Sequence, residues 1–136
     1  MSKKKARPDD AEQVISLLLS GERQDVVILI VPSHDRHEKR LPTQDEWANA
    51  ALDVFGELYG GATAFQAFQG VYKADDGRLL RDRPILIECY AERAALEDRV
   101  RLAEMLAFAK RMGREMRQEA VALIINDAFY LIKDFR

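Results

Sequence analysis

Residues 26–59 read VVILIVPSHDRHEKRLPTQDEWANAALDVFGELY, and this stretch decides the fold class. Its first six residues form an unbroken apolar run rich in β-branched side chains, which predicts a central β-strand that ends at Pro32. Thr43 and Glu46 have the spacing of a capping box, which predicts the start of a helix. Apolar residues then recur every three or four positions through Tyr59, as in a helix that packs one face on a core. The sequence therefore predicts a strand followed by an amphipathic helix.

A hairpin is expected next. Residues 63–73 alternate between apolar and polar side chains and lead to Asp-Asp-Gly at 75–77, a strong hairpin turn signal. The return strand is expected over residues 79–90. Pro84 is expected at a bulge or where pairing begins, because proline cannot donate a ladder hydrogen bond.

The second half of the chain repeats this order of helix and hairpin. A long amphipathic helix is expected over residues 94–116, then a strand over 120–125, a turn at Asn126 and Asp127, and a last strand over 129–133. This order predicts an α+β fold, the ferredoxin-like split β-α-β sandwich. Its mostly antiparallel sheet would carry two main helices on one face, with an extra N-terminal helix and a C-terminal β-hairpin strand.

The chain has the size of one domain. Its first residues are strongly basic, so we predict a disordered basic tail over residues 1–8 and a single α+β domain over residues 9–136. A helix is expected from Asp9 or Asp10 to Ser20. Cys89 is the only cysteine, and no apolar run reaches the length of a membrane span, so we predict a cytoplasmic protein with no membrane partner.

Two helices can protect only one face of the predicted sheet, and the other face is also apolar. The residues expected there are mostly aromatic or aliphatic, and they form the candidate partner or ligand face: Phe68, Tyr72, Leu86, Glu88 and Tyr90. Soluble monomers rarely expose so large an apolar patch. Three covers stay open at this point: the sheet of a second subunit, the N-terminal helix, or a small molecule.

Our main functional prediction is a small, non-enzymatic module that binds a protein partner or itself through this face, in its simplest form as a homodimer. The alternative is an enzyme or small-molecule sensor with a cleft on the same face, using Glu88 and the tyrosines. No catalytic residues and no cofactor are predicted. Nucleic-acid binding is disfavoured, because the body of the domain is acidic and the usual RNA-binding signature is absent.

Three other groups of residues could carry chemistry. His34 and His37 lie three positions apart in a charged loop, but neighbouring arginines and lysines disfavour a cation, so we predict a solvated loop and no metal. Arg81 and Arg83 could bind an anion, although a polar hairpin arm is the simpler interpretation. Cys89 is expected to be a buried, unreactive thiol.

Several short motifs resemble an uncharacterised bacterial domain-of-unknown-function family with a ferredoxin-like α+β fold. They are Asp45-Glu46-Trp47, Gly60-Gly61-Ala62-Thr63, Gly70-Val71-Tyr72, Asp76-Gly77-Arg78 and the segment 117–121. The chain departs from the family pattern where Ala62 replaces a leucine and Tyr72 replaces a tryptophan. The resemblance implies a small α+β sandwich and supplies no catalytic residues.

Overall fold

The computed structural model describes residues 8–21 and 24–136 of the chain. The helices are α1 (Pro8–Ser20), α2 (Gln44–Tyr59), α3 (Arg93–Glu97) and α4 (Arg99–Glu115). The strands are β1 (Gln24–Val31), β2 (Thr63–Gln66), β3 (Gly70–Lys73), β4 (Leu79–Asp82), β5 (Ile85–Glu92), β6 (Val121–Ile125) and β7 (Ala128–Ile132). The predicted tail falls largely on residues 1–7, which lie outside the described residues, and Pro8 already begins α1.

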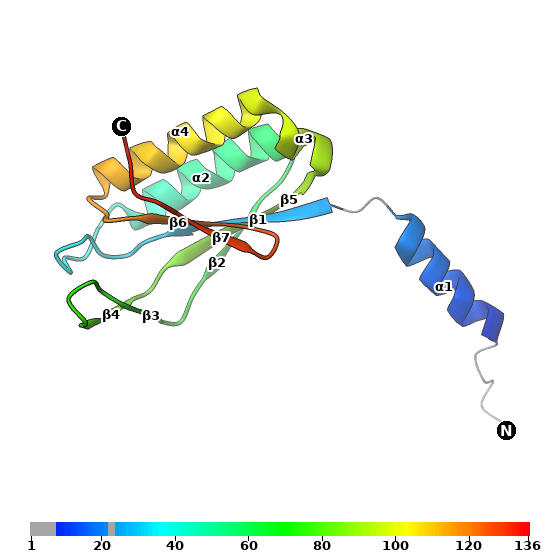
Figure 1. Ribbon diagram of the computed structural model, residues 1–136, viewed down its shortest axis with the longest axis horizontal. Coiled ribbons are helices and arrows are strands. Elements are labelled where there is room, and N and C mark those ends of the chain that lie inside the picture. The colour runs from blue at the N-terminus through cyan, green and yellow to red at the C-terminus, as the bar shows by residue number, and fades with distance from the viewer. Residues whose placement is uncertain (1–7, 22–23) are drawn as a thin grey trace, which may run out of the picture.

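The strands form two sheets. The main sheet has five strands in the order β2-β5-β1-β6-β7, and every neighbouring pair is antiparallel. Strands β3 and β4 pair only with each other, as a separate hairpin sheet. Helices α2 and α4 lie side by side on one face of the main sheet (Figure 1). The predicted α+β class, with a mostly antiparallel sheet, is confirmed.

The core lies between the main sheet and this pair of helices. Alternate residues of the three central strands point into it, as the two-residue period of a strand requires. In β1 these are Val27, Leu29 and Val31, all buried. They pack in one cluster with Phe55 of α2 and Met112 of α4, which are also fully buried. We call this the covered face of the sheet.

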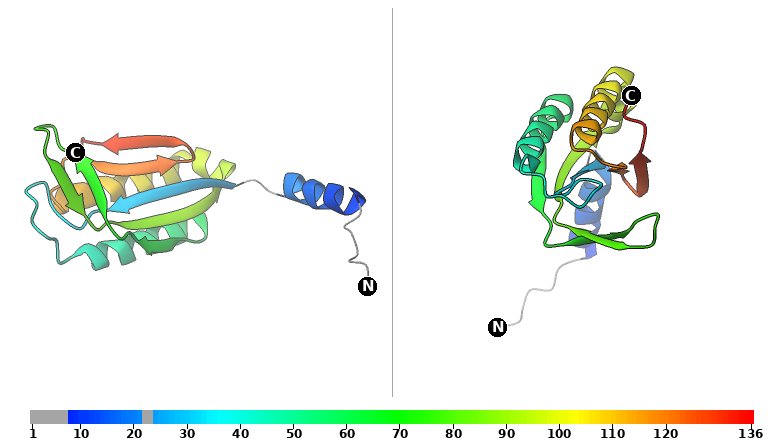
Figure 2. Two further views of the ribbon diagram at one scale, coloured as in Figure 1. Left: turned by 90° about the horizontal axis from the view of Figure 1, so that it is seen from below. Right: turned by 90° about the vertical axis from the view of Figure 1, so that its left-hand side faces the viewer.

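Helix α1 does not shield the opposite, open face of the sheet. It lies beyond the end of the sheet in Figures 1 and 2. Its apolar side chains are exposed, including Leu17, Leu18 and Leu19. The N-terminal helix was one of the three covers considered for the open face, and in this structure it does not fill that role.

The two long strands expected over 63–73 and 79–90 are each broken in two, which corrects the sequence prediction. At the break, side chains replace ladder hydrogen bonds: Ser33 Oγ accepts from the Arg83 amide at 2.8 Å. The Arg83 carbonyl accepts from the side-chain amides of Gln44 at 2.9 Å and Gln66 at 3.1 Å. Pro84 follows directly and offers no N–H. With the backbone groups of Arg83 satisfied in this way, the β3–β4 hairpin can turn away from the sheet.

The long helix expected over residues 94–116 is also interrupted. Asp98 separates α3 from α4 and caps α4, because its Oδ1 accepts from the amides of Val100 at 2.9 Å and Arg101 at 3.1 Å. The capping box expected at the start of α2 is not formed, since Thr43 makes no side-chain cap hydrogen bond. Gly60 ends α2, with a positive φ of 92°.

The final hairpin forms as predicted and is fastened to the start of β1. Asn126 adopts a positive φ of 55°, as the turn demands. Its Oδ1 accepts from the Val26 amide at 2.9 Å, and its own amide donates to the Val26 carbonyl at 2.8 Å. Strand β7 therefore extends the open face by one strand.

Candidate functional site

The open face of the main sheet is a largely apolar surface, with Glu88 as a charged residue within it. The cross-strand register brings together residues from all five strands, with Ile28 opposite both Glu88 and Ile124. The apolar members of this face are Val26, Ile28 and Ile30 of β1, Phe65 of β2, Leu86 and Tyr90 of β5, Ala122 and Ile124 of β6, and Phe129 and Leu131 of β7. None of them is fully buried.

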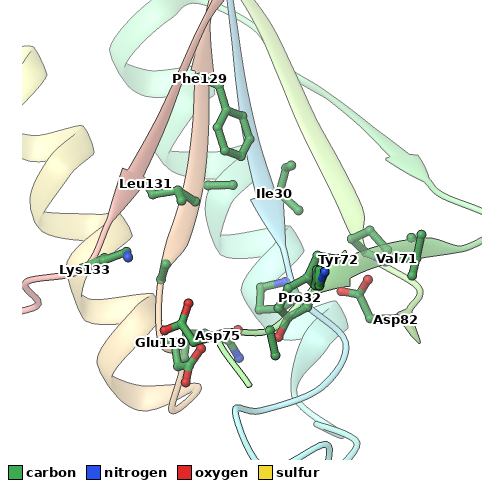
Figure 3. Close-up of a pocket in the computed structure, with 17 residues that line it drawn as sticks. Ile30, Pro32, Val71, Tyr72, Asp75, Asp82, Glu119, Phe129, Leu131 and Lys133 are labelled. Atoms are coloured by element: carbon green, nitrogen blue, oxygen red, sulfur yellow. The ribbon is translucent and has the colours of Figure 1, made fainter. Parts of the chain in front are cut away.

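The β3–β4 hairpin leaves the sheet on this side and closes one end of the open face into a cleft. The cleft has a volume of about 690 Å³. Its floor is apolar and comes from the sheet: Ile30, Ala122, Phe129 and Leu131. Figure 3 shows Phe129, Leu131 and Ile30 along these strands, with Tyr72 and Val71 on the hairpin opposite them.

Charged side chains surround this apolar floor. Three carboxylates line the cleft, those of Asp75, Asp82 and Glu119. Lys73 and Lys133 are the basic residues that line it. Acidic groups therefore outnumber basic ones, and the cleft favours a ligand with positive charge.

Two groups in the cleft have shifted acidities. Burial raises the pKa of the Tyr72 phenol, and the negative charges of Glu119 and Asp82 raise it further. Burial also raises the pKa of the Asp82 carboxyl, against the opposing effects of the His34 imidazole and of a hydrogen bond from the Ser33 backbone. Tyr72 is thus held as a neutral hydroxyl that can donate a hydrogen bond inside an acidic site.

The hairpin wall has little room to spare where Asp82 faces Gly70. These two residues are directly opposite each other in the β3–β4 ladder. A Cβ atom on residue 70 would lie 2.9 Å from Asp82 Oδ1, closer than real Cβ contacts. Because glycine has no Cβ atom, the Asp82 carboxylate can occupy this position in the cleft wall.

The structure separates the five residues that the sequence placed on the candidate face. Tyr72 lies on the hairpin and lines the cleft. Leu86, Glu88 and Tyr90 share one row of β5 on the open face. Phe68 lies between β2 and β3, outside both sheets, with 87% of its surface exposed.

Within that row, Glu88 and Tyr90 lie toward the start of β1, away from the cleft. Tyr90 is opposite Val26 and Glu88 is opposite Ile28, and neither residue lines the cleft, whose β1 lining residue is Ile30. A hydrogen bond with the Glu88 carboxylate raises the pKa of the Tyr90 phenol. A functional role for Glu88 and Tyr90 remains a prediction.

Sequence reasoning did not find most residues of the cleft. Asp75 lies in the predicted hairpin turn, Asp82 in the predicted return strand and Glu119 in the segment 117–121. None of them is predicted as a site residue, because the hairpin is expected to continue the main sheet. The available signal was the interruption at Gly70 and Pro84, which breaks both strands at the same level. Phe129 and Leu131 alternate in the last strand and could have been assigned to the open face from their period alone.

The histidine loop is organised around Asp35 rather than around a metal. The Asp35 carboxylate is buried, accepts from the amides of His37 at 2.8 Å and Lys39 at 3.0 Å, and so has a lowered pKa. Over residues 8–21 and 24–136, no three histidine, cysteine or acidic side chains are grouped so that they could hold a metal ion.

Cys89 is buried in the core, as predicted. Burial raises the pKa of its thiol to about 11, so the thiolate required of a nucleophile is scarce at neutral pH. In the part of the chain that the structure describes, no helix is long and apolar enough to cross a membrane.

Comparison with solved structures finds the same fold in an enzyme. A phage SAM lyase in complex with S-methyl-5'-thioadenosine superposes with a TM-score of 0.62 at 16% sequence identity, covering 84% of this chain and 92% of that chain. A phage SAM lyase in its apo state superposes with a TM-score of 0.59 at 16% sequence identity, covering 85% of this chain and 93% of that chain. No protein-family model and no curated protein matches the sequence.

These comparisons correct two predictions. The resemblance to an uncharacterised bacterial family is wrong, because the fold that the comparison finds is that of a phage SAM lyase. The main functional prediction, a non-enzymatic module, is also wrong, because both solved structures described above are of an enzyme with this fold. Self-association or binding of a protein partner stays a prediction, because an enzyme can also be an oligomer. The alternative prediction, a small-molecule cleft on the open face, is the better supported of the two.

Proposed function

We propose that this protein is a lyase that cleaves S-adenosylmethionine in the cleft between the open sheet face and the β3–β4 hairpin. One observation carries the proposal. An acidic cleft with an apolar floor lies on a fold shared with a phage SAM lyase that was solved with S-methyl-5'-thioadenosine. The volume of about 690 Å³ falls within the usual range of small-molecule sites.

The charges of the cleft suit those of S-adenosylmethionine. The sulfonium and ammonium groups of this substrate are positive, and Asp82, Glu119 and Asp75 supply negative partners. The carboxylate of the substrate is negative, and Lys73 or Lys133 can pair with it. S-methyl-5'-thioadenosine lacks both positive groups, so the acidic cleft binds the substrate more tightly than this product and favours product release.

The apolar floor suits the rest of the molecule. Adenine is a flat aromatic ring, and the exposed ring of Phe129 offers it a stacking surface on the sheet. Ile30 and Leu131 continue that floor beside it. The adenosine part therefore has an apolar surface, and the amino-acid part has the charged walls.

The chemistry follows from substrate and product. Forming S-methyl-5'-thioadenosine breaks the bond between the sulfonium sulfur and the γ-carbon of the amino-acid chain, and the bonding electrons neutralise the sulfur. In a lyase reaction the replacement electrons come from the substrate itself. Either its carboxylate oxygen attacks the γ-carbon and closes a lactone, or a base removes a β-carbon proton and a double bond forms.

The cleft assists both routes. In ring closure, opposite charges cancel as the bond breaks, so a site that excludes water speeds the reaction. In elimination, a carboxylate must take the proton, and Asp82 or Glu119 is available for that role. The neutral Tyr72 hydroxyl can orient the reacting chain by a hydrogen bond in either route.

The finer architecture belongs to the same proposal. The order β2-β5-β1-β6, read with the helices that connect these strands, supports the ferredoxin-like split β-α-β sandwich. Strand β7 extends one edge of that sheet. A cytoplasmic location is part of the proposal too, and the single unpaired cysteine supports it.

The test is to incubate the full chain with S-adenosylmethionine and follow S-methyl-5'-thioadenosine by liquid chromatography. We expect the wild-type protein to form this product, and Glu119→Gln and Tyr72→Phe to lower kcat/KM by at least about tenfold. Glu57→Gln, an exposed carboxylate on α2, is the matched control and should leave the rate unchanged.

The variant Glu88→Gln tests which end of the open face holds the site. Loss of activity in this variant, with full activity in Glu119→Gln, would move the site to the other end of the face. If the folded wild-type protein forms no S-methyl-5'-thioadenosine, the proposal is wrong.

A further inference from the structure

The loop of residues 33–38 lies outside the cleft, yet it is attached to both of its walls. Toward the hairpin, Glu38 accepts from Arg78 Nη1 at 2.8 Å, in addition to the bond from the Arg83 amide to Ser33. Toward β6, the Arg36 amide donates to the Arg117 carbonyl at 3.0 Å. None of the residues 33–38 lines the cleft.

The attachment toward β6 reaches the two residues that precede the cleft carboxylate Glu119. Gln118 Nε2 donates to the His34 carbonyl at 2.8 Å and to the Met116 carbonyl at 3.0 Å. Arg117 follows the C-cap of α4 and adopts the left-handed conformation common there, with a φ of 52°, and the Gln118 amide donates to the Gly113 carbonyl at 2.9 Å. The Arg117 guanidinium lies 3.4 Å from Asp35 Oδ2.

Asp35 is the anchor of this arrangement. Its side chain is 1% exposed, whereas that of Arg117 is 59% exposed. One carboxylate oxygen accepts two backbone amides, and the other is buried with no hydrogen-bond partner and lies 3.4 Å from the Arg117 guanidinium. A buried negative charge without a nearby cation lowers the stability of the fold. The Asp35 carboxylate therefore favours conformations in which the Arg117 guanidinium stays beside it, and this restrains Arg117 and the backbone that follows it.

We propose that Asp35 is a positioning residue for the cleft, which restrains Arg117 through its guanidinium and thereby fixes Glu119 where the substrate binds. The role of Glu119 in this inference rests on the proposed function. Asp35 does not line the cleft, so it acts through the segments that its loop contacts, and of these the segment 117–119 carries Glu119.

A buried aspartate elsewhere in the chain provides a matched control. Asp25 is also buried and its Oδ1 also lies 3.4 Å from a largely exposed arginine, Arg93. It lies at the start of β1, whereas the cleft lies at the end of that strand. Asp25→Asn therefore removes a similar charge at a similar depth without touching the segment 117–119.

The first readout does not depend on activity. In hydrogen exchange on the full chain, Asp35→Asn and Arg117→Gln should speed exchange of the amides of residues 117–119 by about tenfold, and Asp25→Asn should not. Arg117→Gln changes an exposed side chain and should fold normally. It therefore serves as the test variant if Asp35→Asn fails to fold. Unchanged exchange in Arg117→Gln would overturn the inference.

The second readout is the formation of S-methyl-5'-thioadenosine. Asp35→Asn should lower kcat/KM by about tenfold in the wild-type background and by less than about twofold when Glu119→Gln is already present. Equal losses in both backgrounds would mean that Asp35 acts on stability alone and would overturn the inference. If the wild-type protein forms no product, the proposed function fails, and the exchange experiment still decides the role of Asp35.

Discussion

The two faces of the main sheet use the same strands in opposite ways. On the covered face, Leu29, Ile87 and Leu123 are buried against two helices and belong to one cluster. On the open face, the neighbouring residues Ile28, Leu86 and Ile124 are only partly buried. Both faces are apolar, so hydrophobicity alone does not tell a core from a binding surface. What distinguishes them is the group of charged residues at the cleft, of which the hairpin supplies Lys73, Asp75 and Asp82.

The largest effect should come from breaking the covered face. Phe55→Ala removes a fully buried ring and should lower the free energy of unfolding by about 3–5 kcal/mol. Phe129→Ala removes an exposed ring from the open face and should lower it by less than about 1 kcal/mol. Urea denaturation of the two variants measures the difference. Equal losses would mean that the open face is part of the core.

A smaller effect is expected where the C-terminal segment packs on α4. A Cβ atom on residue 113 would lie 2.6 Å from the Phe135 ring at Cζ, so Gly113→Ala forces that ring to move. We expect a net loss of about 1 kcal/mol, because overpacking outweighs the helix propensity that alanine adds. The double variant with Phe135→Ala should recover this loss, and an undiminished loss there would contradict the packing argument.

A substitution in the charged wall of the cleft should raise the free energy of unfolding instead of lowering it. Because burial raises the folded-state pKa of Asp82, the folded protein loses stability as the pH rises from the unfolded-state value of 3.8 through the raised value. Asp82→Asn should therefore stabilise the protein at pH 7, by less than about 1 kcal/mol, while it lowers activity. Thermal unfolding at pH 7 and pH 4 tests this: the advantage of the variant should shrink at the lower pH.

The smallest change in stability is expected at Gly70. The nearest atoms to a Cβ there are the movable end of Asp82 at 2.9 Å and the Pro84 ring at 3.5 Å, and the φ of residue 70 is not in the left-handed region. The free energy of unfolding should change by less than about 0.5 kcal/mol, because the carboxylate can rotate away. Activity should still fall, since Asp82 leaves its place in the wall. A variant with full activity would show that the position of Asp82 is unimportant.

Local patterns predicted the covered face well. The apolar run of β1, the amphipathic stripe that contains Trp47 and Phe55, and the Asn126 turn are each specified within a few neighbouring residues. Their partners could be assigned from the order of elements, because antiparallel neighbours follow from short connections. These features produced the α+β class and most element boundaries.

The cleft depends instead on interactions between residues far apart in the sequence. The hairpin turns away from the sheet because Ser33 and Gln44 satisfy the backbone of Arg83, and no local pattern around residue 83 announces those partners. Asp82 and Glu119 line the same cleft only because the hairpin turns away in this manner. The break at Asp98 was readable in principle, since aspartate is a strong helix N-cap.

The central claim is that the open face and the hairpin together form the substrate site. A crystal structure of this protein grown with S-methyl-5'-thioadenosine tests it most directly. We predict the ligand in the cleft, with its adenine on Phe129 and its sulfur on the side of Tyr72 and Glu119. A ligand bound at Glu88 and Tyr90, or an empty cleft at a saturating ligand concentration, would contradict the claim.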